Sequence, residues 1–256
     1  MNQDYTFQIY GALLDAILEA GYQPCPYLDF LEQGSQMNKA FVLRHDVDRL
    51  PMNALTMAKI QTEKGIRATY YWRIVEESYD EKAIREVVAM GHELGFHYED
   101  LTLAKGDVNK AIALFEKHLD KFRQFYPVKT ICMHGSPFTK WDNREIWKNY
   151  RYQDYGIIGE PYFDTDFEEV FYVTDTGRKW NNESVSVRDR VNSGFDIPVR
   201  STFDMIEKLK SQQMPKLMMH NVHPHRWSGS QAAWLKELVG QNAKNIIKAL
   251  LIKLRK

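Results

Sequence analysis

Apolar residues along the 256-residue chain follow two spacings in turn, which predicts a fold of strands and helices in alternation. Short apolar runs rich in β-branched and aromatic residues predict strands, and apolar residues every three or four positions predict helices. The predicted strands are 41–48, 68–73, 93–97, 129–134, 171–175 and 216–223, with a further short strand at 157–159. The predicted helices are 5–20, 51–64, 80–90, 107–125, 201–212 and 231–254. Residues 23–26, with two prolines, predict a turn.

The order of these elements predicts the fold class. Strand and helix alternate regularly in the first half of the chain, as is typical of βαβ units and a parallel sheet. Crossovers in such units are right-handed, so several in a row coil into an open sheet or a barrel. The chain has no internal repeat, low-complexity segment or obvious linker. We therefore expect an α/β fold in a single domain spanning residues 1–256.

Composition narrows the classes of protein to consider. Lysine plus arginine and aspartate plus glutamate both number 34, so the net charge is zero and no basic stripe for nucleic acid is expected. No stretch approaches the roughly 18 consecutive apolar residues of a membrane span. The polar N-terminus lacks the features of an export signal, so we expect a cytoplasmic protein without an integral membrane segment. Cys25 and Cys132 fit no zinc motif and predict free thiols.

Most of the predicted strands end in a polar residue that could take part in chemistry. In a parallel barrel the carboxyl ends of all strands meet on one face, so residues far apart in sequence converge there. The residues at these ends are Asp46, Asp48, His97, His134, Asp175, His220 and His223. Because strand side chains alternate, only one of the last two histidines can easily face the site, and we choose His223, next to Pro224.

The first of these strand ends predicts either a cation site or a helix cap. Asp46 and Asp48 are two apart, and two carboxylates that converge repel each other unless a cation or a proton lies between them. The alternative is that the pair caps the following helix, with Pro51 in its first turn. Aspartate and histidine together are typical ligands of a catalytic zinc-like ion. Such an ion acidifies water and polarises a carbonyl group.

Three motifs then resemble those of polysaccharide deacetylases, the NodB-homology or carbohydrate esterase 4 family. They are His45-Asp46-Val47-Asp48, Gly91-His92-Glu93-Leu94-Gly95-Phe96-His97, and residues 220–224. The resemblance spans about residues 41–227, and it is to a divergent branch linked to surface-polysaccharide biosynthesis. It implies a distorted (β/α)7 barrel and a divalent metal, with zinc the expected ion. It also implies that the partner is an acetylated sugar or glycan precursor, from which an N- or O-acetyl group is hydrolysed.

The resemblance also implies roles for individual residues. Asp46 would be the general base, Asp48 and His97 metal ligands, and His223 the general acid. Two departures from the family pattern bear on these roles. Val47 separates two aspartates that are adjacent in the family, and a one-residue shift turns a strand side chain to the other face, so the two aspartates could exchange roles.

The second departure is Leu101, which stands where the family has another histidine ligand. We expect His134 to take the place of that ligand, with Glu99 and His223 as the other candidates. If no residue does, the chain is a barrel that binds carbohydrate without catalysis. A third alternative is an amidohydrolase acting on a non-sugar amide.

Substrate contacts are expected from aromatic residues in the loops beyond the strand ends. Trp141, Trp180 and Trp227 could each stack on a sugar ring or pack within their loops. Asp175, in the sequence Thr174-Asp175-Thr176-Gly177, suits either a substrate-binding residue or a turn.

Overall fold

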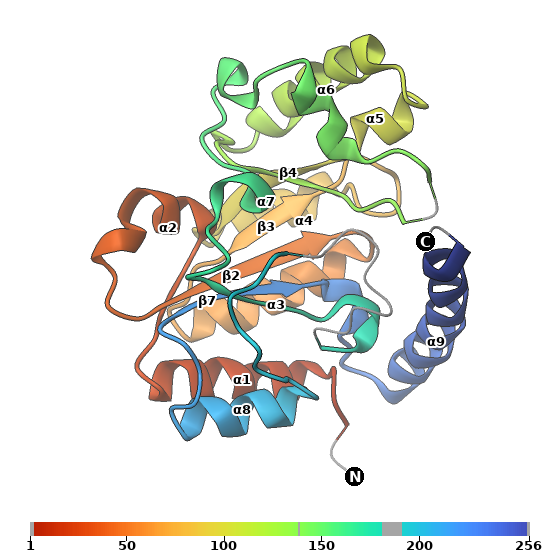
Figure 1. Cartoon of the computed structure of the whole chain (residues 1–256). Coiled ribbons are helices and arrows are strands. Elements are labelled where there is room, and N and C mark those ends of the chain that lie inside the picture. Colours follow the sequence, from red (N-terminus) through yellow and green to blue (C-terminus); the bar gives the residue numbers. More distant parts are fainter. Residues whose placement is uncertain (1–2, 138, 181–190, 255–256) are drawn as a thin grey trace.

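A computed structural model of the chain describes residues 3–137, 139–180 and 191–254. Within these ranges, seven parallel strands form one curled sheet, a half-barrel (Figure 1). The strands are β1 (Gln23–Cys25), β2 (Ala40–Val47), β3 (Thr69–Trp72), β4 (Glu93–Tyr98), β5 (Ile131–Met133), β6 (Phe171–Thr174) and β7 (Leu217–Val222). Their order is β5-β4-β3-β2-β7-β6, and β1 pairs with β2. The parallel α/β class is confirmed, whereas the (β/α)7 count is not.

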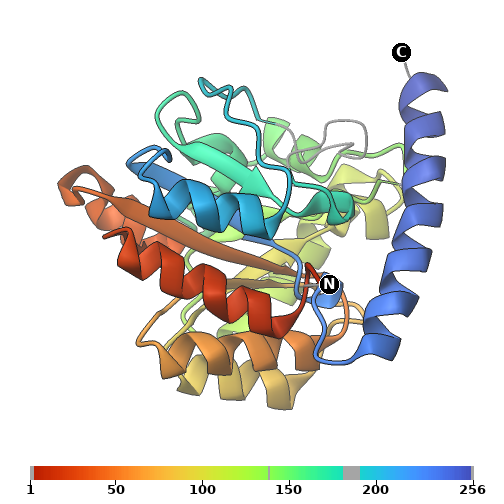
Figure 2. The same ribbon diagram turned by 90° about the horizontal axis from the view of Figure 1, so that it is seen from below.

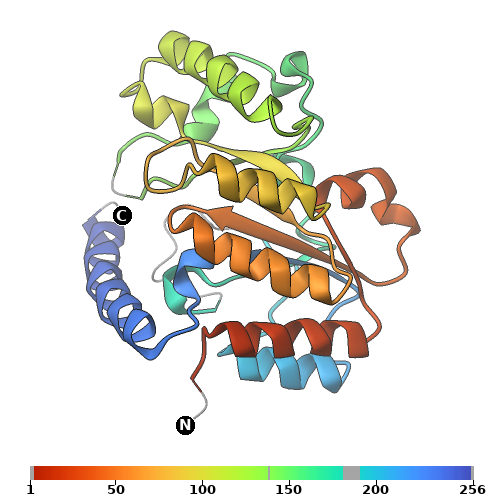
Figure 3. The ribbon, with the colours of Figure 1, turned by 180° about the vertical axis from the view of Figure 1, so that it is seen from behind.

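Helices cover the back of the sheet and follow its curl, as Figure 3 shows. The helices are α1 (Phe7–Glu19), α2 (Tyr27–Gln33), α3 (Pro51–Glu63), α4 (Glu81–Ala89), α5 (Asp100–Leu103), α6 (Val108–Arg123), α7 (Pro161–Asp164), α8 (Thr202–Lys210) and α9 (Gln231–Leu254). The predicted starts at Asp80 and Asp107 are N-caps, because each side chain accepts a hydrogen bond from a backbone amide three residues later. All six predicted helices are present, and so are all the predicted strands other than the short one at 157–159.

Residues 23–26 do not form the predicted turn, because Gln23–Cys25 pair with β2 as β1. β1 lies beside Ala40–Val42, and β3 pairs with β2 only from Arg44 onward, so the start of β2 is open to another strand. Proline is tolerated at a sheet edge because its missing N–H is not needed there. The strand predicted at 157–159 is reduced to a single bridge from Gly159 to Thr130.

The central strand β2 is buried on both faces, as expected where helices and loops cover a parallel sheet. Phe41 and Leu43 pack in the larger core between the sheet and its helices. His45 points the same way, with Nε2 2.8 Å from the hydroxyl of Tyr10 on α1. Asp46 therefore points to the opposite, concave face of the half-barrel.

The last helix, α9, stands beside the ends of the strands instead of against the back of the sheet (Figures 1 and 2). Its buried face is polar: Gln241 and Asn245 are buried, and the amide of Asn245 donates to the carbonyl of Gly177 at 2.8 Å. Leu235 and Val239 are exposed on another face. Of the helices in the described ranges, none has the length and apolar composition needed to cross a lipid bilayer.

Candidate metal centre

β2 ends in a tight turn that brings Asp46 and Asp48 to the same imidazole. The amide of Asp48 donates to the carbonyl of Asp46 at 3.0 Å. His97 Nε2 then lies 3.8 Å from Asp46 Oδ2 and 3.5 Å from Asp48 Oδ1. The pair does not cap α3, whose N-cap position is Leu50, without a side-chain hydrogen bond. The helix-cap alternative is therefore wrong.

Three imidazole rings from three different strand ends converge on Asp48. The Nε2 atoms of His97 and His134 lie 3.5 and 3.6 Å from Asp48 Oδ1, and that of His223 lies 4.0 Å from Oδ2. Asp48 Oδ1 is buried and accepts no hydrogen bond from the described part of the chain. A buried carboxylate oxygen without a donor is costly unless a cation compensates its charge.

Each of these imidazole rings has its other nitrogen, Nδ1, held by an oxygen atom. The oxygens are the Cys132 carbonyl for His97 (2.9 Å), Glu99 Oε2 for His134 (2.9 Å) and Asp175 Oδ1 for His223 (2.6 Å). A carbonyl oxygen can only accept, so the Nδ1 of His97 carries a proton. In the neutral ring the lone pair is then on Nε2 and faces Asp48. This arrangement of an oriented imidazole is typical of metal ligands.

Asp46 differs from Asp48 because both of its carboxylate oxygens already accept hydrogen bonds. Arg44 donates Nε to Oδ1 (3.0 Å) and Nη2 to Oδ2 (2.8 Å), and Asn221 donates to Oδ2 (3.1 Å). Burial opposes ionisation, but the Arg44 guanidinium outweighs it and lowers the pKa of Asp46 to about 2. Asp46 is therefore ionised at neutral pH. It lies beside the candidate metal ligands, but its charge is paired with Arg44.

The electrostatics of the centre favour a cation near His97. Burial opposes the charge on Asp48, yet the nearby imidazoles of His134 and His97 hold the pKa of Asp48 well below its usual range. Burial also disfavours protonation of His97, but Asp46 and Asp48 outweigh it and raise the pKa of His97. The same carboxylates that favour a proton on the ring would favour a divalent ion in its place.

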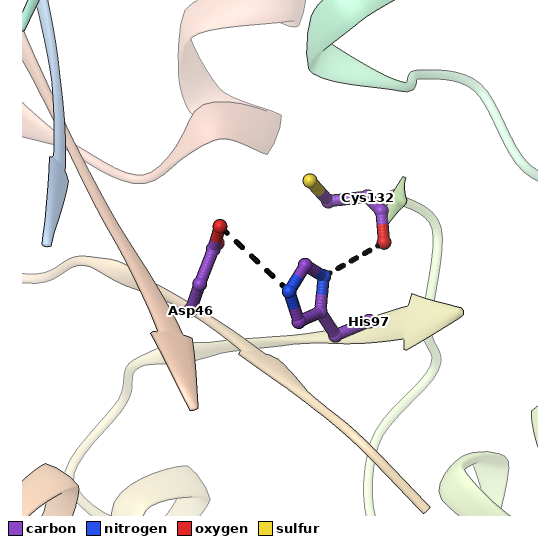
Figure 4. A group of neighbouring side chains, drawn as sticks. All are labelled: Asp46, His97 and Cys132. Atoms are coloured by element: carbon purple, nitrogen blue, oxygen red, sulfur yellow. Dashed lines mark hydrogen bonds and ion pairs between the residues drawn. The ribbon is translucent and has the colours of Figure 1, made fainter. Parts of the chain in front are cut away.

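A second group of potential ligands shares His97 (Figure 4). The ligand atoms of Asp46, His97 and Cys132 all lie within 4.8 Å of one another, and all three residues are buried. Asp46 is held by Arg44 and Asn221, whereas Asp48 Oδ1 has no donor. The predicted set of Asp48, His97 and His134 shares only His97 with this group. Cobalt spectroscopy distinguishes the two sets.

The residues predicted to bind substrate are buried or partly buried within the protein. Trp227 is fully buried and donates Nε1 to Asp175 Oδ2 at 2.8 Å. Trp180 is buried against Tyr5, with the rings stacked at 6.0 Å. Neither presents a ring face to solvent. Asp175 is buried beneath His223, and Trp141 is partly buried over Gly106.

Two residues that support the centre were not predicted. Arg73 donates to both oxygens of Glu99, at 2.7 and 2.9 Å, and so holds the carboxylate that binds His134. Asn221 donates to Asp46, and its position between His220 and Val222 on a strand could have indicated that it faces the site. Arg73 is the last residue of the predicted strand 68–73, and this position at a strand end is the corresponding signal.

Comparison with known proteins adds nothing to this geometry. No protein-family model matches the chain, and neither the curated proteins nor the solved structures give a match. A function has to be inferred from the arrangement of the side chains.

Proposed function

We propose that this chain is a metal-dependent hydrolase that removes an acetyl group from a sugar or glycan precursor, on a distorted (β/α)7 barrel of the polysaccharide-deacetylase type. One observation carries the proposal: three imidazole Nε2 atoms converge on Asp48, and each ring has its Nδ1 held by an oxygen atom. Catalytic zinc sites use three protein ligands, drawn from histidine, aspartate, glutamate and cysteine, and keep one position open.

The donor set fits a divalent ion. Asp48 Oδ1 is buried without a described hydrogen-bond donor, and His97 and His134 present nitrogen atoms to it. Asp48, His97 and His134 would hold the ion, and Glu99 would orient His134. When bound, the ion polarises the acetyl carbonyl and makes water more acidic. His134 supports an active site because it reaches Asp48, although Leu101 stands where the family has a histidine.

Asp46 is the residue that we assign as proton acceptor. In the reaction, a water oxygen forms a bond to the acetyl carbon while Asp46 takes a proton from that water. Arg44 keeps Asp46 ionised, and together with Asn221 it fixes the orientation of the carboxylate. Both aspartates approach His97, but only Asp48 has an oxygen without a donor. We therefore assign Asp46 as the general base and Asp48 as the metal ligand.

His223 is the residue that we assign as proton donor. Its Nδ1 lies 2.6 Å from Asp175, which fixes the ring with Nε2 toward Asp48. The bond from the acetyl carbon to the sugar nitrogen or oxygen breaks as Nε2 delivers a proton to that atom. The products are the free amine or alcohol and acetic acid, which carries the second water proton and releases it to give acetate, so the atoms balance. Asp175 keeps the ring in the orientation that this transfer requires.

The test combines metal analysis with acetate release. Protein purified without chelator is expected to contain stoichiometric divalent metal and to release acetate from acetylated sugars but not from cyclic amides. Asp48→Asn should lose both the metal and the activity. Asp46→Asn should keep the metal and lose about 10²- to 10⁴-fold in kcat, the usual contribution of a general base. Asp120→Asn, an exposed carboxylate on α6, is the matched control.

Two outcomes would contradict the proposal. Full turnover by Asp46→Asn would remove Asp46 as the base. Metal-free protein that binds sugars and releases no acetate would favour the carbohydrate-binding alternative.

A further inference from the structure

Positively charged side chains gather between α9 and the His223–Asp175 pair. They come from the residue after Asp48, from η4 (Thr176–Arg178), from η5 (Pro224–Arg226) and from α9. We call them the α9 cation cluster: Arg49, Arg178, Arg226 and Lys244. The cluster adjoins the centre directly, because Arg226 Nε lies 3.6 Å from Asp175 Oδ1 and Asp175 holds the imidazole of His223.

The two arginines of η4 and η5 are buried, with 9% of Arg178 and 4% of Arg226 exposed. Arg226 Nε and Nη1 and Arg178 Nε are buried and donate to no residue in the described ranges. Arg178 Nη1 donates to the carbonyl of Trp234 at 3.3 Å, and its guanidinium lies over the rings of Tyr5 and Trp234. Buried cations normally have an anionic partner.

Two carboxylates in the described ranges contact the cluster directly, and both have other partners. Asp175 Oδ1 accepts from His223 Nδ1, and Oδ2 accepts from Trp227 Nε1 at 2.8 Å. Glu237 on α9 pairs with Arg49 at 2.7 Å. Among the described residues, Glu237, Asp48 and Asp4 also act on these cations, yet none of them accepts from Arg226 Nε or Nη1 or from Arg178 Nε. Buried guanidinium N–H groups without an acceptor suit a phosphate or diphosphate group.

Lys244 brings the fourth cation from the helix. It is seven residues after Glu237 and three after the buried Gln241, so it lies on the face of α9 that points to the barrel. Burial and the neighbouring Arg49 guanidinium lower the pKa of Lys244, and Arg226 and Asp48 are among the other charges acting on it. Lys236 is exposed and serves as a matched control on the same helix.

We infer that the α9 cation cluster binds a phosphate group of the substrate, so that the acetylated sugar is a sugar phosphate or a diphosphate-linked sugar. Arginine N–H groups and phosphate oxygens match in geometry and charge. The free N–H groups of Arg226 and the ammonium of Lys244 supply the contacts, while Arg178 is fixed by its two aromatic neighbours. The identity of the substrate as an acetylated sugar rests on the proposed function, whereas the binding of a phosphate group does not.

The first experiment measures binding of inorganic pyrophosphate to the full chain by calorimetry. Lys244→Ala and Arg226→Gln should each weaken binding at least about tenfold, the size of one charge-assisted hydrogen bond. Lys236→Ala should not change it. Asp48→Asn should still bind, because the phosphate is held by the cluster and not by the metal. If Arg226→Gln fails to fold, Lys244→Ala carries the test. Absence of binding, or equal weakening by Lys236→Ala, would overturn the inference.

The second experiment compares acetate release from an N-acetylhexosamine, its 1-phosphate, and its nucleotide-diphosphate and lipid-diphosphate forms. Phosphorylated forms should have kcat/KM at least about tenfold above the neutral sugar, and Lys244→Ala should remove that advantage. The form with the highest kcat/KM identifies the source of the phosphate. Equal turnover of neutral and phosphorylated sugars would overturn the inference and leave the proposed function intact. Pyrophosphate binding without acetate release would support the phosphate site and contradict the proposed function.

Discussion

Glu99 holds the ring of His134 from behind: its Oε2 lies 2.9 Å from His134 Nδ1, and Arg73 donates to both of its oxygens. The ring therefore presents Nε2 to Asp48. We expect Glu99→Gln to weaken metal affinity about 10- to 100-fold, the usual effect of removing a carboxylate that orients a ligating histidine. Titration of the metal against a competing chelator measures this.

The adjacent residue provides a matched control for Glu99. Asp100 binds the Nδ1 of His118 at 2.6 Å, in the same carboxylate–imidazole geometry, but His118 belongs to α6. Asp100→Asn should lower Tm and leave metal affinity unchanged. Equal metal affinity in Glu99→Gln and the original protein would indicate that His134 is not a ligand.

Asp175→Asn should separate catalysis from binding. The carboxylate fixes the ring of His223, so its loss should lower kcat by about 10²- to 10⁴-fold, the range for a general acid. Metal content should change little, because Asp175 is buried beneath His223 and contacts none of Asp48, His97 and His134. Steady-state kinetics with metal analysis measures both.

Trp227→Phe is the milder companion of this variant. It keeps a buried aromatic ring but removes the N–H that donates to Asp175. We expect the same direction of change and a smaller one, since His223 keeps its carboxylate. A larger loss of kcat in Trp227→Phe than in Asp175→Asn would assign the effect to packing, and the role of Asp175 would have to be abandoned.

The positions of Asp46, His97 and His223 in the structure follow from a property visible in the sequence. Each lies at the carboxyl end of a predicted strand, and parallel strands bring these ends to one edge. The alternation of side chains likewise predicts that His45 points away from Asp46. For these residues the strand sets the direction, so the sequence is sufficient to bring them together.

The supporting contacts are not predictable in the same way. The contact of Glu99 with His134 and that of Asp175 with His223 join residues 35 and 48 positions apart. They depend on the path of the loop after each strand, which has no periodicity to read. Trp227 illustrates the same point, because a tryptophan beyond a strand end suits a sugar platform and a buried hydrogen-bond donor equally well until its burial is known.

The cobalt-substituted protein distinguishes the two ligand sets that share His97. With Asp48, His97 and His134 as ligands, we expect no thiolate-to-cobalt charge-transfer band in the near ultraviolet, because Cys132 is not bound. Cys132→Ser should leave the spectrum unchanged. A strong band that disappears in Cys132→Ser would assign the ion to Asp46, His97 and Cys132 instead.

Glu160 should make stability depend on pH in a direction unusual for a carboxylate. Burial raises the pKa of Glu160 from 4.5 to about 7, against hydrogen bonds from the amides of Met133 and Tyr162. The folded chain therefore holds this proton more tightly than the unfolded chain. The contribution of protonated Glu160 to the free energy of unfolding is fully present below pH 4.5. It is lost as the pH rises to about 7, by about 3 kcal/mol at the usual value per pKa unit. Urea unfolding across this range should show the fall in the original protein and in the exposed control Glu169→Gln, but not in Glu160→Gln. The same fall in Glu160→Gln would assign the effect to another group.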